Sequence, residues 1–82
     1  MNDQEIITSI QQRMDAIQMQ LALFYSVVER TGRATEGYFS LRKINDLSAT
    51  AMVAAGFGPE AYLQHLDNTA ATIASETARI DA

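Results

Sequence analysis

The sequence predicts an all-α fold, in which a long N-terminal helix and two shorter helices form a helical bundle that dimerisation completes. Apolar residues recur at alternating intervals of three and four over residues 7–28 and 63–80, which is the spacing of helix faces. Glycine and proline residues stand between these segments, where helices end or begin. The 82 residues suffice for one small domain, which we place at residues 1–82.

The composition is typical of an acidic globular protein. Apolar residues make up 48% and charged residues 20% of the chain, and the net charge is −4. The absence of cysteine excludes a disulfide framework, a cysteine zinc site and a thiolate nucleophile, and favours a cytoplasmic location. The start, MNDQEIITS, has two acids and no base, unlike a signal peptide. We expect no membrane segment, because the uncharged stretch 16–28 is shorter than the about 20 residues that a spanning helix needs.

The first helix is expected over residues 3–31, and it carries the strongest pattern in the chain. Asn2 and Glu5 have the spacing of a capping box, and Gly32 supplies a stop. At about 1.5 Å per residue this helix is roughly 40 Å long, more than two short helices easily cover. Its apolar residues alternate like the a and d positions of a coiled coil: Ile7, Ile10, Met14, Ile17, Leu21, Phe24 and Val28. We therefore expect this helix to pair with a second copy.

The second helix is expected over residues 38–55. Gly32 and Gly37 are expected to break the helix before it. The stretch YFSLRKI also shows a weak two-residue alternation, which is typical of a strand. From Leu41 onwards the apolar residues keep helical spacing, which favours a helix over a strand. Gly56 then stands where a left-handed capping residue is expected.

The third helix is expected over residues 59–80. Pro59 suits its first position, because proline lacks only an amide that has no partner there. The apolar face of this helix is thin, since alanine and threonine alternate with leucine and isoleucine along it. Small residues permit a close approach but bury little area, so we expect this helix to pack on the larger residues of the first.

Four of the six basic residues cluster around the first connection. Lysine and arginine near loops and helix ends are the residues that bind phosphate groups, so one interpretation is a phosphate or nucleic-acid contact. The other is a solvated turn, and the acidic charge of the whole chain favours it, because that charge repels a polyanion. The candidate anion-binding residues are Arg30, Arg33, Arg42 and Lys43.

No catalytic, metal-binding or cofactor-binding motif is recognisable. His65, the only histidine, has no acid at the three- or four-residue spacing that would pair them on a helix. We therefore expect a non-enzymatic interaction module, without cofactor or metal: an adaptor, assembly factor or inhibitor of a larger protein, which forms a homodimer through its first helix. The alternative is a nucleic-acid or phosphate-ligand binder that uses residues 30–43. The residues expected at the dimer or partner interface are Ile10, Met14, Ile17, Leu21, Phe24, Tyr25, Val28, Tyr38, Phe39 and Phe57.

Overall fold

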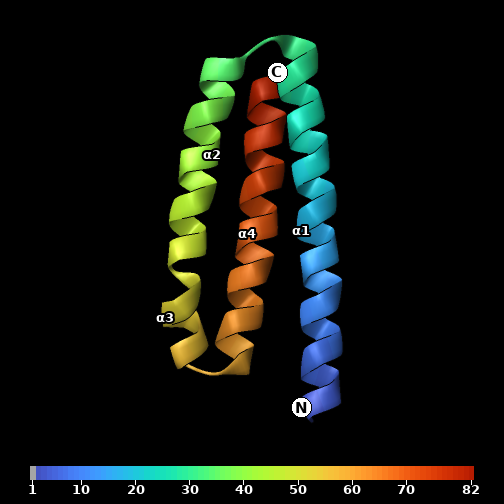
Figure 1. The fold of residues 1–82 in the computed structure, drawn as a ribbon, viewed down its shortest axis with the longest axis vertical. Coiled ribbons are helices and arrows are strands. Elements are labelled where there is room, and N and C mark those ends of the chain that lie inside the picture. The colour runs from blue at the N-terminus through green and yellow to red at the C-terminus, as the bar shows by residue number, and fades with distance from the viewer. Residues whose placement is uncertain (1) are drawn as a thin grey trace.

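The computed structural model describes residues 2–82, apart from the side chain of Ser48, and the regular elements in this range are all helices. In chain order they are α1 (Asp3–Thr31), α2 (Ala34–Ala49), α3 (Ala51–Gly56) and α4 (Pro59–Asp81). α2 and α3 follow one another along the same side of the bundle, and we call them together the α2–α3 leg (Figure 1). The prediction of an all-α fold is confirmed.

α4 lies between α1 and the α2–α3 leg (Figure 1). It runs in the same direction as α1, and these two helices form the most extensive contact in the bundle, whose dimensions are 45 × 21 × 14 Å. We call the end that holds the α1–α2 connection and the C-terminus the closed end, and the end that holds the N-terminus and the α3–α4 connection the open end. α1 and the α2–α3 leg lie further apart at the open end (Figure 1).

α1 begins and ends where local signals in the sequence place it. The Asn2 side chain accepts a hydrogen bond of 2.8 Å from the Glu5 amide, and its Nδ2 atom donates to Glu5 Oε1 at 3.1 Å. The first of these bonds occupies a backbone amide that the first turn of a helix leaves without a partner. At the other end Gly32 takes the left-handed conformation, with φ of 69°, and donates its amide to the Val28 carbonyl.

The expected helix over 38–55 is in the structure two helices, and it starts earlier. Gly37 does not interrupt the helix but lies buried inside α2. The interruption falls instead at Thr50, whose hydroxyl donates to the Leu47 carbonyl at 2.7 Å and competes with the regular helix pattern. Gly56 does not adopt the left-handed conformation; among the described residues only Gly32 and Gly58 have positive φ. Gly58 leads into Pro59, which occupies the first turn of α4 as expected.

The core runs along the seam between α1 and α4 and is completed by the α2–α3 leg. Phe24, Ile73 and Ile80 are fully buried, and they belong to α1 and α4. α2 contributes Ile44 to the same cluster. The apolar face of α4 therefore packs on large residues of α1, as its thin composition predicts.

Candidate functional site

The apolar repeat of α1 divides in the structure into two sets of residues. Ile10, Ile17 and Phe24 belong to the core cluster or pack against it, and Ile17 and Phe24 are buried. The other set lies on the side of α1 next to these residues and is less covered, since Ile7 is 49% and Met14 39% exposed. The helix thus carries more apolar surface than its own chain covers.

Exposure along this adjoining side falls towards the closed end. Leu21 and Val28, which continue the seven-residue spacing of Ile7 and Met14, are half-buried and pack against the core. Tyr25 stands beside them and is exposed. Because residues seven apart lie on nearly the same side of a helix, these residues form one stripe. We call this stripe, in which Ile7, Met14 and Tyr25 are exposed and Leu21 is half-buried, the exposed flank of α1.

The remaining aromatic residues expected at an interface lie on the α2–α3 leg and beside it. Tyr38 and Phe39 are exposed and form an edge-to-face pair with ring centroids 5.6 Å apart. Phe57 is 81% exposed at the open end, and Met52 of α3 is 83% exposed. The structure therefore does not bring the expected interface residues together: Ile17 and Phe24 lie in the core, whereas Met14, Tyr25, Tyr38, Phe39 and Phe57 lie on its surface.

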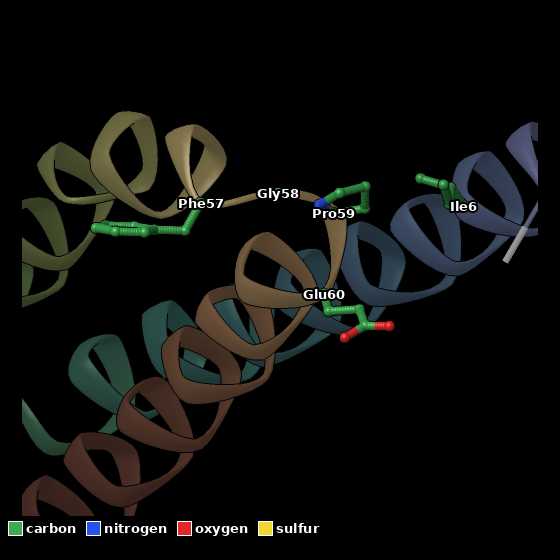
Figure 2. A pocket seen from close by; sticks show the side chains of 5 residues that line it. All are labelled: Ile6, Phe57, Gly58, Pro59 and Glu60. Atoms are coloured by element: carbon green, nitrogen blue, oxygen red, sulfur yellow. The ribbon is translucent and has the colours of Figure 1, made fainter.

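A hollow of about 390 Å³ opens at the open end, between α1, α3 and α4. Its lining is almost wholly apolar and comprises Ile6, Ile10, Ala55, Gly58, Pro59 and Tyr62. A second hollow of about 280 Å³ adjoins it and shares Ile6, Gly58 and Pro59. Figure 2 shows this second hollow, which Phe57 and Glu60 also line. The side chains of Ile6 and Pro59 lie on opposite sides of it, and the ring of Phe57 is turned away from them. We call the two adjoining hollows together the open-end hollow.

Most of the candidate anion-binding residues have partners within the chain. Arg30 pairs with Asp81, Arg33 donates to the Ile80 carbonyl at 2.9 Å, and Lys43 Nζ lies 3.7 Å from Glu76 Oε1. Among the described residues, Arg42 is the member of the cluster for which no hydrogen bond or ion pair is found. Arg33 thus satisfies a terminal carbonyl of α4 and places positive charge at the negative end of its dipole.

Glu76 is a buried carboxylate at the centre of a charge network, whose basic side chains reach it from the surface. Its side chain is 8% exposed, and its Oε2 atom accepts a hydrogen bond of 3.1 Å from Arg79 Nε. Arg79 also donates to the buried hydroxyl of Ser40 at 2.8 Å. Burial alone would raise the pKa of Glu76, but Arg79, Lys43 and Ser40 together outweigh it and lower this pKa below its ordinary value of 4.5.

In the sequence, Glu76 stands among small residues of the helix, and only its spacing from Arg79 indicates a basic partner. Arg79 follows it by three residues, which places the two side chains together on one helix face. That spacing was readable from the sequence. The long-range partners, Lys43 and Ser40, depend on how α2 packs on α4, and they cannot be predicted from the sequence.

No group of three or more metal-ligating side chains occurs in the part of the chain that the structure describes. None of the helices between residues 2 and 82 is both long and apolar enough to cross a membrane. No protein-family model, curated protein or solved structure matches the chain. The surface features of α1 and of the open end are therefore the basis for a functional proposal.

Proposed function

We propose that the protein is a non-catalytic interaction module that self-associates through α1 and acts as an adaptor, assembly factor or inhibitor of a larger protein. The observation that carries this proposal is the exposed flank of α1. Exposed apolar residues scattered singly need no explanation, but a continuous stripe along a helix is typical of an interface. Ile7 and Met14 extend this stripe over two turns of the helix.

The total surface of the chain supports the same proposal. The 82 residues expose 5415 Å², whereas a compact monomer of 9.0 kDa is expected to expose about 4,850 Å². The surplus of about 550 Å² is of the order of the roughly 800 Å² that each partner contributes to a standard interface. A second copy placed along α1 would cover apolar surface that is otherwise in contact with water.

A single substitution on the flank tests self-association, provided that the fold survives it. Ile17 and Phe24 are unsuitable positions, because charge in the core would unfold the monomer. Met14→Glu instead places charge on a side chain that is already partly exposed. The matched control is Met19→Glu, five residues on and about 140° around the helix, where the side chain is 74% exposed.

We expect sedimentation equilibrium at high micromolar concentration to give a dimer for the wild-type protein and for Met19→Glu, and a monomer for Met14→Glu. Circular dichroism should show the same helix content in all three. A monomeric wild-type protein under these conditions contradicts self-association. Equal loss of the dimer in both variants would place the interface elsewhere on α1.

The basic cluster supports the alternative, a nucleic-acid or phosphate-ligand binder, less well. Three of its four side chains already neutralise or cap groups of the same chain, as described above. We therefore retain the interaction module as the proposal.

A further inference from the structure

α4 lies between α1 and the α2–α3 leg, and these two outer elements lie furthest apart at the open end (Figure 1). The larger part of the open-end hollow opens there, between α1, α3 and α4. Helices of a bundle fill such a gap by laying an apolar face into it. The residues that line the larger of its two parts come from all three elements, with Ile10, Ala55 and Tyr62 as examples, and Glu60 lines the smaller part.

The charges around this end determine what kind of helix fits. The segments that form it, residues 2–12 and 50–63, contain Asp3, Glu5 and Glu60 and no lysine or arginine. Arg13 stands next to it, but its Nε atom lies 3.0 Å from Asp67 Oδ1 and is paired. The N-termini of α1 and α4 contribute about half a positive charge each, which leaves the open end net negative.

A negative rim around an apolar hollow selects among the occupants. Anionic lipid and nucleic acid are repelled by it. The open end of a second copy would bring the same acids face to face, which is unfavourable. A helix that carries apolar residues on one side and lysine or arginine on the other meets both features at once.

We propose that the open-end hollow binds a basic amphipathic helix of a partner protein; this inference rests on the interaction role proposed above. Apolar side chains of the partner helix enter between Ile10, Ala55 and Tyr62, and its basic side chains lie against Glu60 and the first turn of α1. Self-association uses the adjoining flank of α1, so the two activities are separable by experiment.

Two synthetic helical peptides of equal length serve as probes, one of leucine and lysine and the other of leucine and glutamate. Each carries a fluorophore, and binding to the intact protein is followed by anisotropy. We expect the lysine peptide to bind and the glutamate peptide to fail. Binding should weaken between about 0.02 M and about 0.5 M salt, because surface charges are screened over that range.

Matched variants distinguish the hollow from general attraction to an acidic protein. Glu60→Lys and Glu29→Lys change the net charge equally, but Glu60 lines the hollow and Glu29 lies near the closed end of α1. We expect Glu60→Lys to weaken the binding of the lysine peptide about fivefold or more, because exposed ion pairs are lost and a repulsive charge takes their place. Glu29→Lys should change its affinity by less than about twofold.

The apolar part of the site has its own pair of variants. Ala55 lines the hollow, and Ala55→Gln fills part of it. Met19→Gln changes an exposed side chain of α1 away from the hollow. We expect Ala55→Gln to reduce the affinity for the lysine peptide and Met19→Gln to leave it unchanged.

Several results would overturn the proposal. These are no binding of the lysine peptide, binding of both peptides, or equal effects of the open-end variants and their controls. If the Glu60→Lys or Ala55→Gln variant has a mass closer to the monomer than the wild-type protein has, the hollow is assigned to a second copy instead. A monomeric wild-type protein that still binds the lysine peptide at the hollow would refute self-association alone and leave this inference standing.

Discussion

Gly37 of α2 lies so close to Val28 of α1 that a Cβ atom on the glycine would stand 2.9 Å from Val28 Cγ2. Real Cβ atoms essentially never approach a neighbour that closely, so a larger residue here requires Val28 or one of the two helices to shift. This contact holds α1 and α2 together at the closed end. Towards the open end α1 and the α2–α3 leg diverge (Figure 1). The open-end hollow lies there, between α1, α3 and α4.

We predict that Gly37→Ala destabilises the protein, although the same change inside a helix ordinarily stabilises it. The gain in helix propensity is about 0.5–1 kcal/mol, whereas overpacking against Val28 costs about 1–3 kcal/mol. Urea denaturation measures the balance, which we expect to be a net loss. In a Val28→Ala background the clash is relieved, so Gly37→Ala should there be neutral or stabilising.

Gly56→Ala is the matched control for this prediction. Gly56 is the last residue of α3, and a Cβ atom there would meet nothing within 4 Å. We expect no loss and a gain in the free energy of unfolding of at most about 0.5–1 kcal/mol, the full value for a helix interior. Equal effects of the two substitutions would show that the contact with Val28 has no energetic consequence.

Phe24 and Tyr25 are neighbours in the chain that we predict to differ sharply in their contribution to stability. Phe24 is fully buried against α4, so Phe24→Ala should cost about 3–5 kcal/mol in the free energy of unfolding. Tyr25 is exposed, and Tyr25→Ala should cost under about 1 kcal/mol in a dilute, monomeric sample. Thermal melts followed by circular dichroism compare the two. A large loss for Tyr25→Ala in the monomer would place this side chain in the core.

The Glu76 network predicts a loss of stability in acid. The pKa of Glu76 is lower in the folded than in the unfolded chain, so its contribution is fully present above about pH 4.5 and is lost as the pH falls through the lowered value. Glu76→Gln should cost about 1–3 kcal/mol at neutral pH, because it leaves Arg79 and Lys43 without their carboxylate. The difference in melting temperature between the wild type and Glu76→Gln should shrink below pH 4.5. Glu60→Gln, an exposed control, should leave the neutral-pH stability almost unchanged.

Arg33 is predicted to stabilise the C-terminal end of α4. Arg33→Gln removes a charged donor to the Ile80 carbonyl and should lower the free energy of unfolding by about 0.5–1 kcal/mol. Arg42→Gln changes the charge equally at an exposed position and should have little effect. If Arg42→Gln proves as costly as Arg33→Gln, the capping role is refuted.

Binding of DNA or RNA should not be detected in a filter-retention assay at low ionic strength. The net charge of −4 opposes the approach of a polyanion, and most of the basic cluster is engaged inside the chain. Retention that is lost on Arg42→Glu would revive the nucleic-acid alternative, since Arg42 is the member of the cluster that is available at the surface.

The features that could be predicted from the sequence depend on neighbouring residues. The start of α1 at Asn2 and its stop at Gly32 follow from side-chain and backbone geometry within one turn, and the structure has both. Pro59 at the start of α4 is a signal of the same kind. The features that could not be predicted depend on packing. The sequence predicts a helix break at Gly37, because the close approach of this residue to Val28 is not visible in one sequence.

The candidate site illustrates the same division. The repeat on α1 correctly indicated apolar residues that pack, but it could not tell which of two adjoining sets faces α4. That choice depends on the parallel placement of α1 and α4, and it buries Ile17 while leaving Met14 exposed. The open-end hollow arises from three elements that are distant in sequence, so no local pattern could reveal it.

The pairing of the first helix with the last has a consequence for the order of folding. Arg30 and Asp81, which meet at the closed end, are 51 residues apart in the chain. Closing so long a loop costs entropy before any α1–α4 contact repays it, which slows folding relative to bundles whose neighbours are consecutive helices. The α2–α3 leg, once docked, can detach without separating α1 from α4, so its amide protons should exchange with solvent before those of the central helix.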